Sequence, residues 1–257
     1  MGGALVGGMI RSGVFAPNQI QVSDVDPKRI QELVELYGIN GTTNNSELVK
    51  SCSCVILAVK PAVVDTVLRP LTSFFSGDQL LISIAAGITI NHLEKILPGI
   101  PIIRAMPNAP CIIGAGVTAI ALGSKTENKH HQLAEKVLGS MGKTWTVEEK
   151  LMDAVTGLSG SGPAYVYLII EALADGGVLA GLPHSLALAL ATETVIGAAK
   201  MVEQTQQHPG ILKNQVTSPG GTTIAGLSEL ETSGVRGALM RAVERATMRS
   251  QELSRPE

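Results

Sequence analysis

Aromatic side chains are scarce in this sequence: Phe, Tyr and Trp make up 3% of its 257 residues, whereas 45% are hydrophobic. The core must therefore be built from aliphatic residues, and the 28 glycines favour close packing of helices. Excess positive charge is also lacking, because 20 Lys and Arg stand against 22 Asp and Glu. Without aromatic stacking surfaces or a basic field, we expect no nucleic-acid partner.

Cysteine is rare as well, with Cys52, Cys54 and Cys111 as the three examples. An odd, sparse set provides no disulfide framework and suits a reducing compartment. No second cluster of Cys or His complements Cys52 and Cys54, so we interpret them as small packed side chains. We therefore expect no metal site.

Long uninterrupted apolar runs are missing too. The apolar opening Met1–Ile10 has no basic residue ahead of it and leads into Arg11, which is unlike a secretory signal. The apolar stretch after Pro163 is interrupted by Glu171 and Asp175, which argues against a membrane-spanning segment. We expect a cytoplasmic protein with no membrane partner.

Residues 1–147 alternate short apolar runs with helical patterns. The predicted strands are Ile20–Val22, Cys54–Val59, Leu80–Ile84, Ile100–Ala105 and Val117–Ala121, and the predicted helices include Pro27–Tyr37, Pro61–Leu71 and Thr89–Leu97. Apolar strands that alternate with helices are typical of an α/β fold, in which a parallel sheet is covered on both faces. This half is predicted to be a doubly wound, nucleotide-binding domain.

Residues 148–257 show no strand pattern. The predicted helices are Leu151–Leu158, Ala164–Ala180, Ser185–Gln204 and residues 222 to the end, all rich in Ala, Leu and Gly. Smooth apolar faces of this kind favour association of subunits. We predict an all-α domain that takes part in oligomerisation.

The glycines at Gly2 and Gly3 resemble the end of a dinucleotide-binding turn, without the strand that normally comes first. The alternative is an ordinary helix start. We expect a first strand and a glycine turn ahead of Met1. Without them, the chain as written should bind NAD(P)H poorly, while its helical half should still dimerise.

An acidic residue follows the strand predicted at Ile20–Val22. Ser23 and Asp24 lie where a dinucleotide-binding domain places the carboxylate that accepts hydrogen bonds from the adenosine ribose. Asp24 and Asp26 could equally be turn residues before Pro27, and the sequence leaves both interpretations open.

Three further turns follow predicted strands. They comprise Ala58, Val59, Lys60 and Pro61, then Ile84, Ala85 and Ala86, and then Asn108 within Met106–Pro110. Each alone could be a structural turn. Ligands of open α/β sheets lie at the carboxyl ends of strands, so three such turns together predict a cofactor cleft.

Two segments in the second half combine glycines with hydroxyl groups. Thr156–Gly162 precedes Pro163, and Ser218, Gly221, Thr222 and Thr223 precede a predicted helix. Free N–H groups and hydroxyls at a helix N-terminus suit a carboxylate. The alternative is plain N-capping by Ser218 or Thr222. The histidines fit neither a triad nor a zinc site; His208 is interpreted as a turn residue, and His130 and His131 are expected to face solvent.

The sequence resembles the pyrroline-5-carboxylate reductase family over nearly its full length. The motifs that carry the resemblance are AVKP from Ala58, AAG from Ala85, MPNAP from Met106, DAVTGLSGSGPAY from Asp153, ADGG from Ala174, QHPG from Gln207 and SPGGTT from Ser218. The last of these is highly specific for the family.

The resemblance implies a Rossmann-type NAD(P)-binding domain at residues 1–147 and an all-α substrate-binding and dimerisation domain at residues 148–257. It implies reduction of 1-pyrroline-5-carboxylate to L-proline with NADPH or NADH, by a homodimer or a larger ring of dimers. It implies cofactor contacts from Asn45, Ala58–Pro61 and Ile84–Ala86. Glu149, Thr222 and Thr223 would line the imino-acid site, and Ser218 and Gly221 would help to hold the carboxylate. Thr156 would approach the imine nitrogen as the catalytic residue.

One departure concerns the cofactor. Several members carry an arginine near the adenosine 2′-phosphate, where this sequence has Val25. We therefore expect NADH preference or dual use, unless Lys28 and Arg29 reach the phosphate. Two alternatives remain: a β-hydroxyacid dehydrogenase, which would ordinarily use a lysine that Thr156–Gly162 lacks, and a catalytically silent oligomerising homologue.

Overall fold

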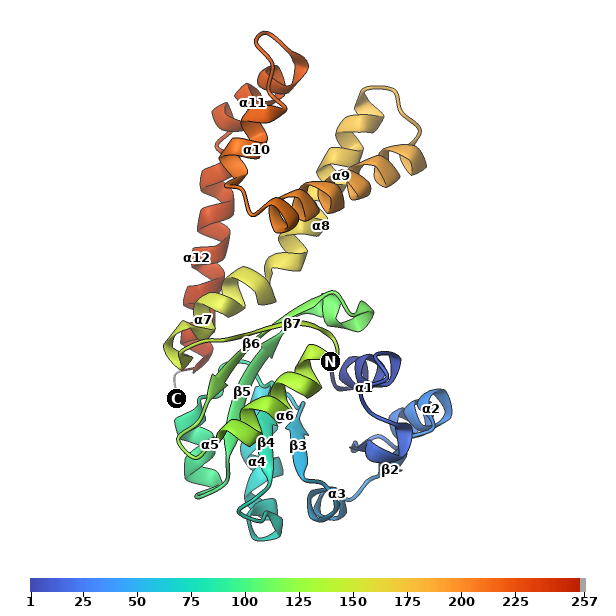
Figure 1. Ribbon diagram of the computed structural model, residues 1–257, viewed down its shortest axis with the longest axis vertical. Coiled ribbons are helices and arrows are strands. Elements are labelled where there is room, and N and C mark those ends of the chain that lie inside the picture. Colours follow the sequence, from blue (N-terminus) through green and yellow to red (C-terminus); the bar gives the residue numbers. More distant parts are fainter. Residues whose placement is uncertain (255–257) are drawn as a thin grey trace. The chain divides into compact units, whose positions relative to one another are not determined.

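The computed structural model describes residues 1–254 and divides into two compact units (Figure 1). The first unit comprises Met1–Ser161 together with the chain from Arg245 onward, and the second comprises Gly162–Glu244. Residues 148–161 are thus grouped with the first unit. The predicted functional boundary between residues 147 and 148 stays a prediction.

Two sheets form the first unit. Its strands are β1 Gln21–Ser23, β2 Asn40–Thr42, β3 Cys54–Leu57, β4 Leu80–Ser83, β5 Ile102–Pro107, β6 Gly116–Leu122 and β7 Gly142–Thr146. β1 and β2 form a parallel pair, and the other strands form a sheet in the order β3-β4-β5-β6-β7. The five predicted strands are confirmed, whereas the short strands β2 and β7 were missed.

The expectation of a wholly parallel sheet is wrong at one position, because β6 runs antiparallel to β5. The connection between them holds only the short 3-10 helix Ala109–Ile113. A parallel crossover needs a dozen or more residues, so this connection allows only an antiparallel return. An apolar run such as Val117–Ala121 predicts a buried strand but says nothing about its direction.

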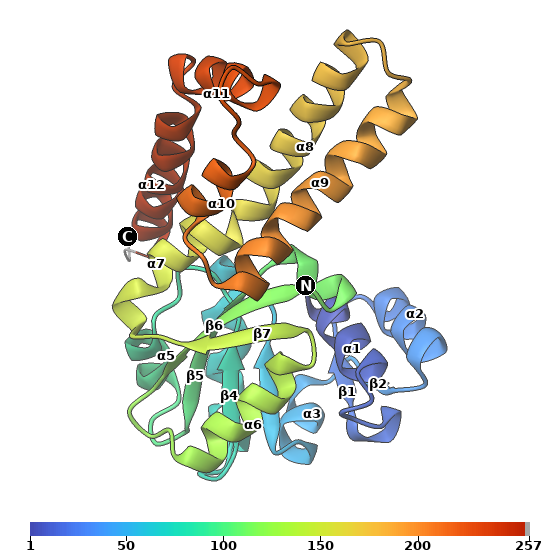
Figure 2. The same cartoon turned by 45° about the horizontal axis from the view of Figure 1, so that its top comes forward.

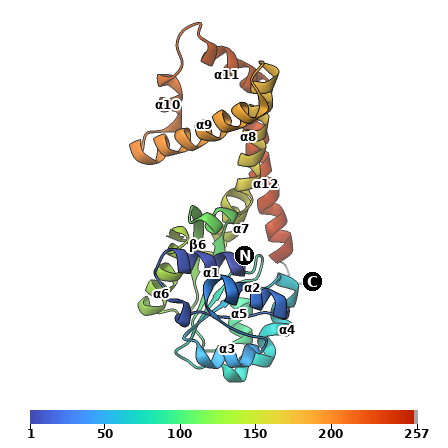
Figure 3. The ribbon, with the colours of Figure 1, turned by 90° about the vertical axis from the view of Figure 1, so that its right-hand side faces the viewer.

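Helices cover both faces of the five-stranded sheet (Figure 2, Figure 3). The first-unit helices are α1 Gly2–Arg11, α2 Pro27–Tyr37, α3 Asn45–Ser51, α4 Val64–Leu68, α5 Ile90–Ile96, α6 Asn128–Gly139 and α7 Met152–Val155, with short 3-10 turns between some of them. Buried residues of α1 and α6 pack with Leu80 and Ile82, and those of α3, α4 and α5 pack with Leu81. This alternation along β4 gives the sheet two apolar faces, as a doubly wound fold requires.

The outer strand β7 has a polar sequence, GKTWT, which explains why it was missed. It pairs in parallel with β6 from Gly116 to Ile120. Trp145, the single tryptophan of the chain, lies on β7 and is 51% exposed. A strand with so little burial lacks the hydrophobic pattern from which strands are recognised.

The second unit is helical, as predicted. It contains α8 Gly162–Leu179, α9 His184–Thr205, α10 Pro209–Gln215, α11 Thr222–Thr232 and the first part of α12 Val235–Ser254. α8 and α9 form an antiparallel hairpin (Figure 2). The helix predicted from residue 222 onward is in fact two helices, because Gly234 adopts a left-handed φ of 69° between them.

The second unit buries little of its apolar surface. The buried hydrophobic residues of Gly162–Glu244 are alanines, Ala174, Ala187 and Ala191 at the α8–α9 contact. Large side chains such as Leu168 and Leu179 are 65% and 91% exposed. Glu149–Leu179 and His184–Thr205 are long and apolar enough to cross a membrane, which by itself is weak evidence of a span.

Candidate active site

The predicted ribose contact lies where β1 ends and α3 begins. The Ser23 hydroxyl donates to Asn45 Oδ1 over 2.7 Å, and both residues are half-buried. Asp24 Oδ1 accepts from the backbone N–H of Asp26, and Asp26 caps α2 through the N–H of Lys28. The turn interpretation is therefore confirmed for both aspartates. Asp24 keeps its second carboxylate oxygen, so a ribose contact stays a prediction.

The N-terminus of α1 offers backbone N–H donors beside the turn that follows β3. α1 has no side-chain cap, and its first intrahelical bond runs from Leu5 N–H to the Met1 carbonyl. The N–H groups of residues 2 to 4 have no partner among residues 1–254. A Cβ added at Gly2 would lie 3.4 Å from that of Ala58, so α1 begins beside the AVKP corner. Bare glycine N–H groups at a helix start suit a pyrophosphate.

The AVKP and AAG turns follow β3 and β4, which are neighbours in the sheet. Ala58, Lys60 and Pro61 are exposed and Val59 is half-buried. After β4, Ile84 and Ala86 are half-buried, whereas the side chain of Ala85 is buried in the core. Only the backbone of Ala85 could therefore face a ligand. An exposed corner after β3 and a turn of mostly small residues after the adjacent β4 together fit a nicotinamide cofactor.

Asn108 is buried and its side chain is engaged within the protein. Its Oδ1 accepts from the N–H of Val117 at 2.9 Å, and its Nδ2 donates to the carbonyl of Ser159 at 3.1 Å. These bonds hold the turn around Ser159 against the ends of β5 and β6. A direct cofactor contact by Asn108 stays a prediction, but the two bonds give this side chain a structural task.

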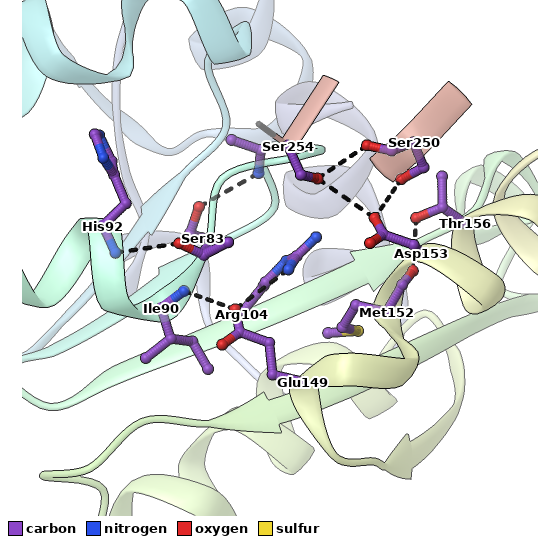
Figure 4. A network of polar contacts seen from close by, with 12 residues as sticks. Ser83, Ile90, His92, Arg104, Glu149, Met152, Asp153, Thr156, Ser250 and Ser254 are labelled. Carbon is purple, nitrogen blue, oxygen red and sulfur yellow. Dashed lines mark hydrogen bonds and ion pairs between the residues drawn. The ribbon is translucent and has the colours of Figure 1, made fainter. Parts of the chain in front are cut away.

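Glu149 lies in an ion pair that the sequence did not reveal. Its Oε1 accepts from the backbone N–H of Ile90 at 2.7 Å and lies 3.2 Å from Nη1 of Arg104 (Figure 4). The Arg104 side chain is only 7% exposed, so this carboxylate neutralises a buried guanidinium. Glu149 thus accepts from the first N–H group of α5 through Oε1. A substrate contact through Oε2 stays a prediction.

Thr156 begins a π-turn, Thr156–Gly160, that follows α7. The carbonyl of Thr156 accepts from Ser161 N–H at 2.8 Å, and its hydroxyl donates to the Met152 carbonyl at 2.8 Å (Figure 4). Single π-turns inserted in helices are frequent at functional sites. The glycine–hydroxyl pattern predicted an interruption here, and the structure identifies its form.

The end of α12 contacts the same segment. Ser250 donates to Asp153 Oδ1, one turn before Thr156, and the Ser254 hydroxyl lies 3.4 Å from the same oxygen (Figure 4). Ser250 is 5% exposed. Nothing in the sequence spacing predicts this contact, because the partners are about a hundred residues apart.

Ser218–Gly221 forms a tight turn before α11 in the second unit. Gly221 N–H donates to the Ser218 carbonyl at 3.1 Å, and Gly220 has a φ of 67°, which its lack of a side chain permits. α11 begins with Gly221 as N-cap and no side-chain cap. The capping alternative is therefore wrong, and the N–H groups of Thr222, Thr223 and Ile224 have no partner within the described chain.

Two other expectations about side chains are settled by the structure. His130 is buried, not solvent-facing: its Nδ1 accepts from Glu127 N–H at the start of α6, and its Nε2 has no described hydrogen-bond partner. His131 is half-buried and bonds Thr146. The Cys54 thiol is enclosed, and burial, with Cys52 beside it, raises its pKa to about 12. A thiol held protonated is a poor metal ligand, which fits the interpretation of Cys54 as a small packed side chain.

The first unit thus brings together Ser23 with Asn45 and places Glu149 and Thr156 on one continuous segment. Ser218, Gly221, Thr222 and Thr223 lie together in the second unit. The small turns at the strand ends of the first unit fit a dinucleotide. The second unit presents a helix start without a side-chain cap, together with wide exposed apolar faces. These features define an NAD(P)-dependent oxidoreductase with a Rossmann-like domain and a helical dimerisation domain.

Comparison with known proteins identifies the family. Residues 149–253 match the pyrroline-5-carboxylate reductase dimerisation family, and residues 1–87 match the coenzyme F420-dependent NADP oxidoreductase family. The pyrroline-5-carboxylate reductases of Glycine max and Escherichia coli are 46% and 38% identical, and each alignment covers 99% of this chain and 93% or 95% of the relative.

Solved structures agree. That of a Coxiella burnetii pyrroline-5-carboxylate reductase has a TM-score of 0.91 at 34% identity, covering 98% of this chain and 94% of that one. That of Plasmodium falciparum pyrroline carboxylate reductase with NADP bound has a TM-score of 0.90 at 32% identity, covering 99% and 95%. The chain belongs to the pyrroline-5-carboxylate reductase family.

Proposed function

We propose that this protein transfers hydride from NAD(P)H to the C5=N bond of 1-pyrroline-5-carboxylate and releases L-proline, the last step of proline biosynthesis. The observation that carries the proposal is the uncapped start of α11. Three adjacent N–H groups and two threonine hydroxyls there suit the carboxylate of a small imino acid. Family membership and the nicotinamide-binding fold support the same reaction.

The carboxylate contacts divide between turn and helix. Ser218 and Gly221 shape the turn, and Thr222 and Thr223 supply N–H and hydroxyl donors. Ser218 Oγ approaches Gly221 closely: a Cβ there would lie 2.2 Å away, so a larger residue would require the Ser218 hydroxyl to move. Because the carboxylate keeps its charge throughout the reaction, these contacts bind substrate and transition state alike.

Thr156 is proposed to orient the imine nitrogen rather than to protonate it. Its hydroxyl hydrogen is already donated to the Met152 carbonyl, so its lone pairs remain to accept from an N–H group. An iminium ion that arrives protonated offers such a group. Glu149 Oε2 supplies a negative charge that favours the same iminium form, while its Oε1 stays paired with Arg104.

NAD(P)H would supply the hydride, and this chain's contribution is to hold the reacting atoms in position and exclude water. Ser23, Asn45, the Ala58–Pro61 corner and Ile84–Ala86 are proposed to bind the cofactor. Asp24 accepts from a ribose 2′-hydroxyl but repels a 2′-phosphate, and Val25, which is 92% exposed, supplies no cation. We therefore expect NADH preference or dual use; a much higher kcat/KM with NADPH would contradict this and implicate Lys28 or Arg29.

The decisive experiment is NAD(P)H oxidation with pyrroline-5-carboxylate. A panel of β-hydroxyacids is the control, because a β-hydroxyacid dehydrogenase would oxidise them with NAD(P)+. Turnover of the imino acid alone supports the proposal. Turnover of neither substrate by a folded, cofactor-binding protein would indicate a catalytically silent homologue and refute it.

The proposal also covers the domain division, the oligomeric state and the cellular location of the protein. The dimerisation family match begins at residue 149, which supports a functional division between residues 147 and 148. We expect a homodimer, with rings of dimers as a larger form, acting in the cytoplasm without nucleic-acid or membrane partners. Exposed apolar helices suit a protein interface in this setting.

A further inference from the structure

The last turn of α12 forms a hydroxyl–carboxylate cluster with α7. Ser250 Oγ donates to Asp153 Oδ1 at 2.6 Å, a short distance typical of a charge-assisted bond. Ser254 Oγ lies 3.4 Å from the same oxygen and donates to the Ser250 carbonyl at 2.9 Å (Figure 4). The two serines therefore converge on one carboxylate oxygen.

This carboxylate lies on the segment that presents Thr156. Asp153 and Thr156 are three residues apart, and the hydroxyl of Thr156 is bonded to Met152, the residue before Asp153. The π-turn that follows is held by the Ser161-to-Thr156 bond and by the bond from Asn108 Nδ2 to the Ser159 carbonyl, so contacts from other segments contribute to its shape. A displacement of Asp153 would move the Thr156 hydroxyl with it.

The same turn of α12 also touches the cofactor corner. Gly87, next to Ala86, has a φ of 76°, and a Cβ there would lie 3.2 Å from the Leu253 carbonyl and 3.4 Å from Ser254 Oγ. The AAG turn thus packs directly on the backbone of α12. One short piece of helix contacts both the turn that follows β4 and the segment that carries Thr156.

Stability alone does not require this cluster. Burying a carboxylate and a hydroxyl costs desolvation, and apolar side chains of similar volume often stabilise a fold equally well. Directional hydrogen bonds, unlike apolar contacts, also fix the relative positions of the groups that they join. We propose that Asp153, Ser250 and Ser254 are positioning residues that set the Thr156 hydroxyl for imine reduction. The inference rests on the proposed function of Thr156, and it assigns the three residues no contact with substrate.

Steady-state kinetics of the full-length protein test the inference first. Ser250→Ala and Asp153→Ala should each lower kcat about ten-fold while the KM values for imino acid and cofactor change less than about two-fold, because binding groups stay in place. Asp153→Asn keeps an acceptor oxygen and should retain kcat within about three-fold. Ser73→Ala, at an exposed serine of the first unit, should behave as wild type.

A double-mutant cycle separates positioning from general damage. In a Thr156→Ala background, Ser250→Ala should lower kcat by less than about two-fold, since the group it positions is gone. An unchanged kcat in Ser250→Ala, or an equal loss in both backgrounds, would overturn the inference. If the wild type turns over no pyrroline-5-carboxylate, the proposed function has failed. The wild-type rate therefore tests the proposed function, and the comparison of variants tests the positioning role.

Hydrogen exchange gives a readout that does not depend on turnover. Amides of residues 156–161 should exchange about ten-fold faster in Ser250→Ala than in wild type or Ser73→Ala, while the amides of β4 and β5 stay unchanged. Equal exchange at residues 156–161 in all three proteins would also overturn the inference, whatever the activity.

Discussion

The two units of this protein differ in how much of their hydrophobic side-chain surface is buried. In the first, large residues such as Leu80, Ile82 and Ile103 are fully enclosed between helices and sheet. In the second, buried hydrophobic positions are occupied by alanines, and leucines such as Leu168 and Leu190 remain 65% and 50% exposed. The difference shows that the first unit carries its own core, whereas the second needs another surface to complete one.

The family match identifies that surface as a second copy of the chain, because residues 149–253 correspond to the dimerisation family. Wide exposed apolar faces on a folded chain mark association sites. Association and folding of the second unit should therefore be thermodynamically linked, and its stability should depend on protein concentration.

The largest expected effect is loss of dimerisation through a substitution in the second unit. Leu168→Glu on α8 places a charge on the apolar face and should weaken dimerisation at least 100-fold, about 3 kcal/mol. The melting temperature should then fall and become more sensitive to concentration. Light scattering during size-exclusion chromatography, with calorimetry at two concentrations, measures both.

The matched control is Leu36→Glu on α2 of the first unit, where the leucine is 69% exposed. Exposed substitutions of this kind usually change stability by less than about 0.5 kcal/mol. If Leu36→Glu and Leu168→Glu behave alike, the contrast between the two units is mistaken.

The second largest expected effect is a loss of turnover caused by a substitution in the first unit. Thr156→Ala should lower kcat by about ten-fold or more, equivalent to about 1.4 kcal/mol, because the iminium N–H loses its acceptor. The dimer should stay intact, which distinguishes this variant from Leu168→Glu. Unchanged turnover by a folded dimer would remove Thr156 from the mechanism.

The third effect lies at the start of α11. Thr223→Val should raise the KM for the imino acid about five-fold or more, with a smaller loss of kcat, because a carboxylate contact stabilises ground and transition states alike. Initial rates over a range of substrate concentrations separate the two parameters. Thr232→Val, at the far end of α11, is the control. A fall in kcat at constant KM would assign Thr223 to the chemical step.

The smallest effect concerns a surface pair of the first unit. His92 Nε2 lies 2.6 Å from Asp65, and this hydrogen bond, with Arg69 adding to it, lowers the pKa of Asp65. A lowered folded pKa stabilises the protein above the unfolded value of about 3.9, and this contribution is lost as pH falls through the folded value. Because Asp65 is 39% exposed, solvent screening limits the gain to about 0.5 kcal/mol.

Asp65→Asn should thus lower the melting temperature by about 1–2 °C at pH 7 and leave it unchanged near pH 3. Asp78→Asn, at a side chain that is 96% exposed, serves as control. A deficit in Asp65→Asn that persists at pH 3 would show that the carboxylate charge is not responsible.

Much of the fold was predictable because strongly apolar strands and capped helices carry local signals. α2 spans Pro27–Tyr37 as predicted, with Asp26 as cap and Gly38 at its end. The strands β2 and β7 were not predicted, because short, polar, exposed strands have no hydrophobic periodicity. The direction of β6 depends on the length of its connection, and the burial of His130 depends on helix packing that no local pattern encodes.

In the candidate site, the sequence predicted local backbone irregularities where glycine and hydroxyl residues cluster along the chain, as at the π-turn in Thr156–Gly162 and the uncapped helix start after Ser218. The site was not predictable where contacts join distant segments. Arg104 and Glu149 are 45 residues apart, and Asp153 and Ser250 are 97 apart. Such pairs depend on tertiary structure, and a single sequence contains no spacing rule for them.

The scarcity of aromatic residues gives the molecule a built-in spectroscopic reporter. Trp145 is its single tryptophan and lies half-exposed on β7 of the first unit. Its fluorescence therefore follows one unit, whereas far-ultraviolet circular dichroism follows the helices of both. On dilution or heating, coincident curves would mean that the molecule unfolds as a single cooperative system. Separated curves would show the helical unit losing its structure while the tryptophan signal persists.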